Sequence, residues 1–213
     1  SVVINPIDNS VAADAKTVVL TPLASSSYQF GSPTAGTVTI NDNDVEGIVV
    51  SSTNTGGPIS FTSITTIEND VATNTTFKFY VKLNSQPTAN VTVPIDSSNY
   101  SEGRVNNGVA PYLLTFTPGN WFTYQMVTVT GVDDFLDDGS IAYTVSIGQP
   151  TTTDTRYAVI NPPDISAVNR DDDVAGVTVT GVVAITEAAG SSPTGTYQLR
   201  LNSQPPLGNN VTI

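Results

Sequence analysis

The sequence predicts an all-β protein made of tandem immunoglobulin-like antiparallel β-sandwiches. Three observations support this fold class. Short segments rich in Val, Thr, Ile, Tyr and Phe alternate between apolar and polar residues, which is typical of half-buried strands. Clusters of Gly, Pro, Asn and Ser separate these segments at turn-like intervals. Parts of the sequence also return after more than one hundred residues, which indicates repeated domains.

Each expected strand has apolar side chains at every second position, so that one face can pack on a core. No stretch shows the apolar spacing of 3.6 residues that an amphipathic helix needs. The clearest expected strands are "TFKFYVKL" (76–83), "NVTVPI" (90–95), "YQMVTVTGV" (124–132), "IAYTVSI" (141–147), a last strand of the full repeat near 158–168, and "GVTVTGVV" (176–183).

Internal repeats set the expected domain boundaries. "LNSQPTANVTV" at 83–93 returns as "LNSQPPLGNNVTI" at 201–213, and Glu68 and Glu187 precede the two copies at nearly the same distance. The segments 2–9 and 16–21 resemble 127–134 and 141–146, and "TVTINDND" resembles "DISAVNRDDD". We therefore expect the C-terminal half of one repeat at 1–45, a complete repeat at 46–173, and the N-terminal half of a further repeat at 174–213.

Composition excludes several classes of function. The 213 residues contain 19 Asp and Glu but only 7 Lys and Arg, giving a net charge of −12. Such a chain lacks the basic patch that nucleic acid or an anionic lipid surface requires. There is no cysteine and no histidine, so disulfides, thiolate sites and histidine-based nucleophile pairs are excluded. No apolar run is long enough to insert into a membrane.

Alternating strand directions place the acidic clusters of the complete repeat at one end of the sandwich. Glu68 lies ahead of the strand 76–83, and the strands 90–95, 124–132 and 158–168 all run toward the same end. The carboxylates expected there are Glu68, Asp96 or Glu102, Asp133, Asp134, Asp137, Asp138, Asp171, Asp172 and Asp173.

Clustered carboxylates repel one another unless a cation compensates them. Two carboxylates about 4 Å apart repel by roughly 4 kcal/mol at an effective dielectric constant near 20. Oxygen ligands that converge from several loops are the set that Ca²⁺ prefers, whereas soft metals require sulfur or imidazole. We therefore expect Ca²⁺ as the cofactor, with acidic loops that are merely solvated as the alternative. No EF-hand loop is present.

The sequence resembles tandem Calx-beta domains, in particular the long bacterial type found in cell-surface and secreted proteins. The resemblance rests on Glu68 ahead of "FKFYVKLNSQPTANVTV", on "LTFTPGNWFTYQMVTVTGVDDFLDDG", on "IAYTVSIG" and on "NRDDD". It implies calcium bound by Glu68, by Glu102 or Asp96, by the acids of 133–138 and by Asp171, Asp172 and Asp173. Asp96, Asn99 and Glu102 remain open as the second contributor. The flanking half-repeats offer a poorer set, namely Asp8, Asp14, Asp42, Asp44 and Glu187.

These observations predict a non-enzymatic, calcium-binding structural or adhesive repeat segment of a large extracellular or cell-surface protein, in which Ca²⁺ stiffens the joints between domains. Its expected partners are neighbouring repeats or like subunits. Two alternatives stay open: a filament subunit assembled by strand complementation between half-domains, and a module that binds surface polysaccharide through Trp121 and its aromatic neighbours. The secretion signal that this localisation requires is expected outside these 213 residues.

Overall fold

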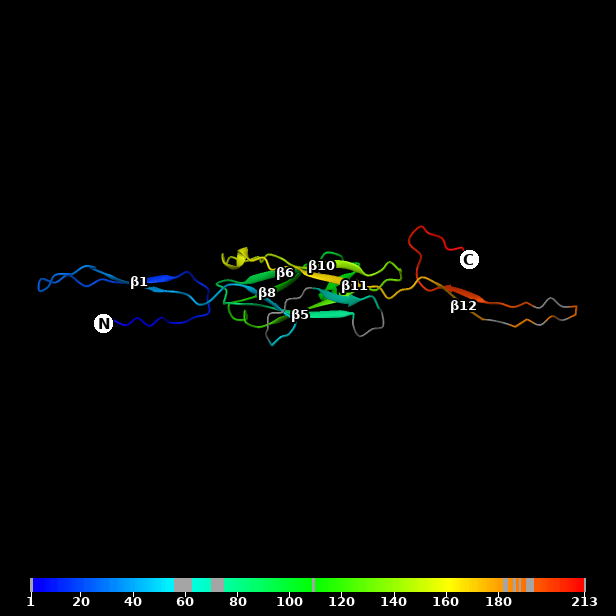
Figure 1. Cartoon of the computed structure of the whole chain (residues 1–213), viewed down its shortest axis with the longest axis horizontal. Coiled ribbons are helices and arrows are strands. Elements are labelled where there is room, and N and C mark those ends of the chain that lie inside the picture. The colour runs from blue at the N-terminus through cyan, green and yellow to red at the C-terminus, as the bar shows by residue number, and fades with distance from the viewer. Residues whose placement is uncertain are drawn as a thin grey trace.

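The structure is a computed structural model that describes residues 2–55, 63–69, 75–108, 110–181, 184–185, 187, 189–190 and 194–212. A central β-sandwich lies between two extended hairpins, so the molecule is elongated (Figure 1). The regular structure in these ranges is strands and two short 3₁₀ helices, η1 (Asn106–Gly108) and η2 (Tyr157–Val159). Within the described ranges, no helix has the length and apolarity that crossing a membrane requires.

One layer of the sandwich is a five-stranded sheet whose strands run in the order β4-β11-β10-β6-β8. Inward-facing apolar residues alternate with outward-facing polar ones along its central strands, because successive side chains of a strand point to opposite faces. The five strands are β4 (Ile64–Ile67), β6 (Val91–Ser97), β8 (Tyr112–Phe116), β10 (Ile141–Ile147) and β11 (Ile165–Arg170).

The other layer is a four-stranded sheet in the order β3-β5-β9-β7. Its long central strand, β5, buries Phe79, Val81 and Leu83 and turns Lys78 and Lys82 outward, as the period-two pattern predicts. The four strands are β3 (Ile48–Ser51), β5 (Thr76–Leu83), β7 (Gly103–Val105) and β9 (Gln125–Gly131).

The core lies between the two sheets and contains apolar side chains from both. Val91, Val93 and Ile95 of β6 are fully buried, as are Val127 and Val129 of β9. Burying one such side chain stabilises the fold by about 1.5–3 kcal/mol. The β-sandwich expected from the sequence is therefore confirmed.

β4 departs from the antiparallel pattern, since it runs parallel to β11 with Ala167 opposite Ile64 and Arg170 opposite Ile67. The chain leaves the four-stranded sheet after β3 and joins the edge of the five-stranded sheet as β4. Because parallel neighbours end at the same side of a sheet, the residues that follow β4 and β11 meet. This pairing brings Glu68 close to the segment that begins at Asp171.

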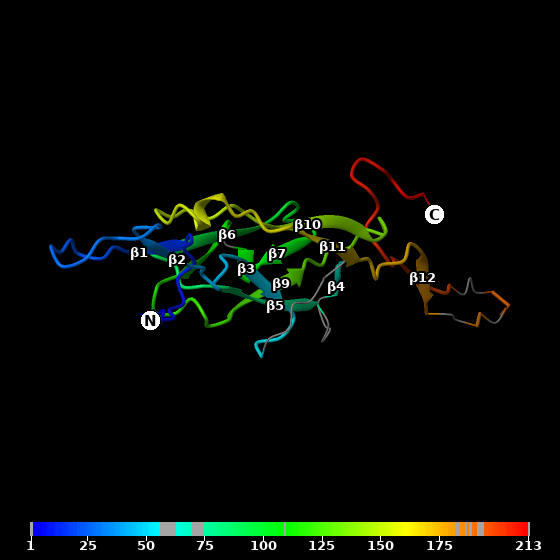
Figure 2. The same cartoon turned by 60° about the vertical axis from the view of Figure 1, so that its left-hand side comes forward.

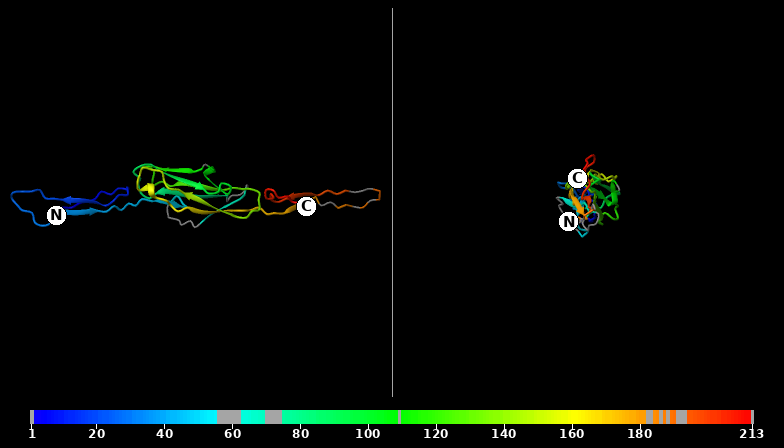
Figure 3. Two further views of the ribbon diagram at one scale, coloured as in Figure 1. Left: turned by 90° about the horizontal axis from the view of Figure 1, so that it is seen from above. Right: turned by 90° about the vertical axis from the view of Figure 1, so that its right-hand side faces the viewer.

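Two separate two-stranded hairpins flank the sandwich, and Figures 2 and 3 show them extending from opposite ends. The N-terminal hairpin pairs β1 (Lys16–Leu20) with β2 (Gly36–Ile40), and the C-terminal hairpin pairs β12 (Val177–Thr180) with β13 (Gln198–Leu201). The strand expected at 176–183 is shorter than predicted, and residues 182 and 183 lie outside the described residues. The strand expected near 158–168 begins only at Ile165, after η2.

Asp154 links two loops by hydrogen bonds at the end of the sandwich nearer the N-terminal hairpin. Its buried carboxylate accepts hydrogen bonds from the Thr88 amide and hydroxyl at 2.7 and 2.9 Å, and from the Arg156 and Tyr157 amides at 3.0 and 3.3 Å. Burial opposes ionisation of this carboxyl, but these hydrogen bonds outweigh it and lower its pKa below the ordinary value. Asp154 thus has a structural role apart from the acidic clusters.

Candidate metal centre

The acidic clusters of the sandwich lie together at its end nearer the C-terminal hairpin. Glu68 follows β4, Glu102 precedes β7, and the loop 132–138 follows β9. The amide of Val132 donates to the Glu102 carbonyl at 2.9 Å, which joins the last two segments. We call this group of carboxylates the acidic end; its members are Glu68, Glu102, Asp133, Asp134, Asp137, Asp138, Asp171, Asp172 and Asp173.

Glu68 and Glu102 form the buried floor of the acidic end. Their side chains are 2% and 7% exposed, respectively. The amide nitrogen Nδ2 of Asn169, on β11, donates to Glu68 Oε1 at 2.9 Å and reaches Glu102 Oε2 at 3.5 Å and the Val132 carbonyl at 2.9 Å. One amide therefore holds together two carboxylates from different segments of the chain.

A buried polar network holds Asn169 in this orientation. The hydroxyl of Thr66 donates to Asn169 Oδ1 at 2.8 Å and lies 3.2 Å from the Tyr143 hydroxyl. Gly131 lies directly beside these groups, and a Cβ at this position would stand 2.5 Å from Asn169 Oδ1. Because buried polar networks are costly when a partner is missing, this network fixes the position of the carboxylates.

Burial and the surrounding negative charges disfavour ionisation of Glu68. Burial, then the close side-chain contact with Glu102, and then the negative charges of Glu102, Asp134 and Asp171 raise the pKa of Glu68 to about 8. Burial and the same kind of repulsion raise the pKa values of Asp138 and Asp173. In the absence of a cation, Glu68 therefore holds a proton in the folded protein at neutral pH.

Two oxygens of the acidic end are buried without a hydrogen-bond partner in the described part of the chain. They are Glu68 Oε2 and Asp173 Oδ2. A buried carboxylate oxygen that accepts no hydrogen bond is costly, and a hard cation is one group that can compensate it. The oxygens that could act as ligands here belong to carboxylates, which fits Ca²⁺.

The aspartates of the loop and of the linker are already oriented by backbone hydrogen bonds. Asp171 Oδ2 accepts from the Gly139 amide at 2.6 Å, Asp134 Oδ1 from the Leu136 amide at 2.7 Å, and Asp137 Oδ2 from the Ala175 amide at 2.7 Å. Among the described residues, no three acidic side chains already stand in an arrangement that could hold a metal ion. Cation binding therefore requires these side chains to turn inward.

The structure places the other sequence candidates apart from the floor. Asp96 lies within β6, opposite Ser146, and its carboxylate accepts from the neighbouring Ser97 amide at 2.8 Å. The carboxylate beside Glu68 is that of Glu102, so geometry favours Glu102 among the three open alternatives. Glu187 is exposed.

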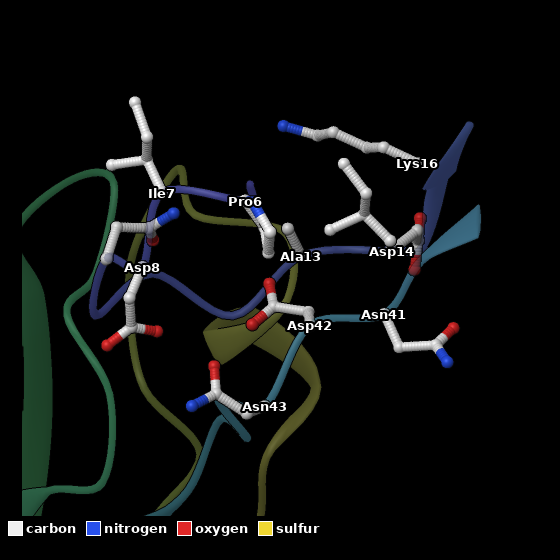
Figure 4. Close-up of a pocket in the computed structure, with 11 residues that line it drawn as sticks. Pro6, Ile7, Asp8, Ala13, Asp14, Lys16, Asn41, Asp42 and Asn43 are labelled. Carbon is white, nitrogen blue, oxygen red and sulfur yellow. The ribbon is translucent and has the colours of Figure 1, made fainter. Parts of the chain in front are cut away.

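The N-terminal segment forms an acidic pocket of about 390 Å³, shown in Figure 4. Asp8 and Asp42 line it, and Asp44 Oδ2, the equivalent of Asp173 Oδ2, is likewise buried and unpartnered within the described residues. Burial, Asp42 and Asp8 raise the pKa of Asp44. Asp14 also lines the pocket, but its carboxylate pairs with the Arg156 guanidinium at 2.6 Å.

Asn169 was not among the predicted site residues, although its amide contacts both Glu68 and Glu102. Its signal in the sequence is the strand alternation, since Ile165 and Ala167 of the same strand are buried and Asn169 continues their face. Trp121, the aromatic candidate for sugar stacking, packs against the core, and Phe122 contacts it edge to face with 5.8 Å between ring centroids.

Comparison with known proteins gives only distant structural similarity. No family model matches the sequence, and no curated protein matches it. Similar solved structures are the apo-form Calx CBD1 domain (17% identity, 53% of this chain and 92% of that chain, TM-score 0.38), CBD12 from CALX1.2 (14%, 66% and 69%, 0.37) and the calcium binding domain CBD12 of CALX1.1 (14%, 67% and 69%, 0.37). At these scores the likeness carries no argument about function.

The pKa of Glu68 leads to a prediction about pH. The unfolded chain titrates this group near 4.5, whereas the folded chain titrates it near 8, so the folded state binds more protons between these values. The contribution of Glu68 to stability is therefore complete below about pH 4.5 and is lost as the pH rises through 8. In EDTA, the melting temperature should fall by several degrees between pH 5 and pH 8. Differential scanning calorimetry should show a smaller fall for Glu68→Gln, and an equal fall in both proteins would contradict this role.

Proposed function

We propose that the acidic end binds Ca²⁺ and that the protein is a non-enzymatic, calcium-stabilised segment of tandem β-sandwich repeats. The observation that carries this proposal is the buried, unpartnered Glu68 Oε2, held beside Glu102 and repelled by Asp134 and Asp171. The residues that would hold the ion are Glu68, Glu102, Asp134, Asp137, Asp138, Asp171 and Asp173, and Asp133 and Asp172 adjoin them. When bound, Ca²⁺ would supply positive charge in place of the proton on Glu68.

The choice of Ca²⁺ follows from the ligands and their supports. All side-chain ligands are carboxylates, and the chain contains neither cysteine nor histidine for a soft or borderline metal. Several aspartates sit on loops, which suits the flexible coordination of Ca²⁺ better than the rigid octahedron of Mg²⁺.

The acidic end is also the joint between the sandwich and the C-terminal hairpin. The loop that carries Asp134 and Asp137 bonds to the linker through the Ala175 amide, and the Phe135 carbonyl accepts from the Gln204 amide at 2.6 Å. Closing these loops around an ion would order the linker as well. We therefore propose that Ca²⁺ stiffens this joint.

The same joint occurs at the other end of the sandwich. The Ser10 carbonyl accepts from the Gln86 amide at 2.6 Å, and Ser10 and Gln86 occupy the repeat positions of Phe135 and Gln204. Likewise, Asn84 donates to Gly47 at 2.8 Å as Asn202 donates to Gly176 at 2.9 Å. This recurrence supports the division into repeats at 1–45, 46–173 and 174–213, and an extended array of the kind that serves as a spacer or adhesive stalk at a cell surface.

Calorimetric titration tests calcium binding directly. Protein freed of metal with EDTA should bind Ca²⁺ with a measurable heat and should bind Mg²⁺ at least about tenfold more weakly. Asp171→Asn should weaken Ca²⁺ binding by about tenfold or more, because Asp171 adjoins Glu68 and the loop.

The matched control is Asp164→Asn, because Asp164 lies at the opposite end of the same strand, where it accepts from the Ile147 amide. This variant should bind Ca²⁺ like the wild type. Absence of heat in the wild type, confirmed by equilibrium dialysis, would remove the calcium proposal.

A further inference from the structure

The outward face of the four-stranded sheet carries positive charge in a protein whose net charge is −12. The four strands of this sheet contain no Asp or Glu. Three of the seven basic residues of the chain point outward from it, because the residues that alternate with them on the same strands are buried or half-buried. We call this surface the basic face; its members are Lys78, Lys82 and Arg104 and their outward-facing neighbours Tyr80, Tyr124 and Met126.

Strand pairing places aromatic and apolar side chains beside these cations. Tyr80 lies between the two lysines on β5 and opposite Met126 on β9. The Lys82 ammonium lies 5.2 Å from the centroid of the Tyr124 ring, so a cation–π contact holds it over this ring. Met126 is 46% exposed, and both tyrosines are half-buried. The basic face therefore offers apolar surface next to positive charge.

The cations of the basic face are not neutralised by the described part of the chain. The ion pairs found there all involve Arg156, which does not belong to this face. Arg104 donates from Nε to the Tyr100 carbonyl at 3.4 Å, and neither it nor the two lysines pairs with a described carboxylate. At an ionic strength of about 0.15 M, exposed charges more than about 8 Å apart are largely screened from one another. A ligand on this face therefore interacts with these cations more strongly than with the distant carboxylates.

We propose that the basic face binds an acidic polysaccharide. The acidic groups of the polymer contact the three cations, and a sugar ring packs on Tyr80 and Tyr124, because a tyrosine combines a flat apolar ring with a polar tip. This surface differs from the one expected around Trp121, whose side chain packs against the core. It requires no metal ion, so this proposal is independent of calcium binding.

The spacing of the cations favours a sparsely charged polymer. Lys82 follows Lys78 by four positions, which corresponds to about 13 Å along an extended strand. The acidic groups of a polysaccharide sit on separate sugar rings, whereas duplex DNA carries one charge per about 1.7 Å of its axis. Three cations at this spacing are too few for nucleic acid or an anionic lipid surface, which agrees with the acidic composition.

The size of the basic face favours an extended glycan over a folded protein. Four strands about 4.8 Å apart, the longest of them roughly 25 Å, present at most roughly 400 Å². A stable protein–protein interface buries about 800 Å² on each partner. A single polysaccharide chain is narrow enough to lie on this face and still contact its cations and rings.

Biolayer interferometry tests the proposal on immobilised polygalacturonate and dextran sulfate, with methyl-esterified polygalacturonate and dextran as their neutral counterparts. The protein, in EDTA and about 50 mM NaCl, should bind at least one acidic polymer about tenfold more tightly than its neutral counterpart. Raising NaCl to about 0.5 M should weaken this binding by about tenfold or more. Binding to either acidic polymer supports the proposal and shows whether carboxylate or sulfate is preferred. Because EDTA removes Ca²⁺, failure here is distinct from failure of calcium binding.

Charge-matched variants locate the binding surface. The double variant Lys78→Gln with Lys82→Gln should bind the acidic polymer at least about tenfold more weakly than the wild type. The control, Lys16→Gln with Arg200→Gln, removes the same charge from exposed positions of the two hairpins and should bind like the wild type. Tyr124→Leu should weaken binding of the polysaccharide by about threefold or more. An unchanged melting temperature shows that each variant is folded.

Polyglutamate separates a polysaccharide site from a surface that attracts any polyanion. Because it lacks sugar rings, it should bind at least about tenfold more weakly than the acidic polysaccharide. Equally tight binding of polyglutamate would overturn the proposal. So would no binding to either acidic polymer, equal binding to the neutral polymers, an equal loss in the two double variants, or full binding by Tyr124→Leu.

Discussion

Saturating Ca²⁺ is expected to raise the melting temperature of this protein by about 10 °C relative to EDTA at pH 7.5. A ligand present at about 100 times its dissociation constant adds about 2.7 kcal/mol to the free energy of unfolding. For a domain of this size, each kcal/mol corresponds to a few degrees. The effect is large because the ion replaces repulsion among buried and half-buried carboxylates with attraction, while the two unpartnered oxygens gain a partner.

Glu102→Gln should remove most of this calcium-induced shift, because Glu102 forms the floor of the site with Glu68. Asp96→Asn is the matched control, since Asp96 lies on β6 and bonds to the adjacent Ser97 amide. Differential scanning calorimetry with Ca²⁺ and with EDTA measures both. Equal shifts in the wild type and Glu102→Gln would place the ion elsewhere, and a shift lost in Asp96→Asn would reverse the assignment of the second ligand.

Gly131→Ala should destabilise the sandwich by about 3 kcal/mol even without Ca²⁺. Its Cβ would lie 2.5 Å from Asn169 Oδ1, 2.9 Å from the Ile67 carbonyl oxygen and 2.9 Å from Thr66 Cβ. Two of these groups belong to the buried network, and the third is backbone, so none can move without breaking a hydrogen bond or shifting a strand. The substitution therefore affects the fold and the floor of the site together.

Urea unfolding in EDTA measures this effect. Gly119→Ala serves as the matched control, because the nearest atom to its Cβ, Thr117 Oγ1, is 3.8 Å away. The control should stay within about 0.5 kcal/mol of the wild type. A loss below about 1 kcal/mol in Gly131→Ala would show that the network tolerates displacement and that Asn169 is not held as tightly as its contacts indicate.

The strand pattern and the clustering of acids could be predicted from the sequence because both are local. Alternation along "TFKFYVKL" fixes which side chains of 76–83 face inward, and strands 76–83 and 141–147 have the expected bounds. The alternating strand directions then predict that acids distant in sequence lie at one end of the sandwich. The predicted strand bounds were less accurate where the alternation is weaker, since β11 and β12 are both shorter than expected.

The tertiary structure decided the features that depend on contacts between strands remote in sequence. Parallel pairing of β4 with β11 brings Glu68 to the linker, and the Asn169 amide selects Glu102 over Asp96. Alternating hydrophobicity specifies which face of a strand is buried but not its neighbour in the sheet. Composition and spacing therefore determined a β-sandwich with an acidic end, and strand pairing determined which carboxylates share a buried floor.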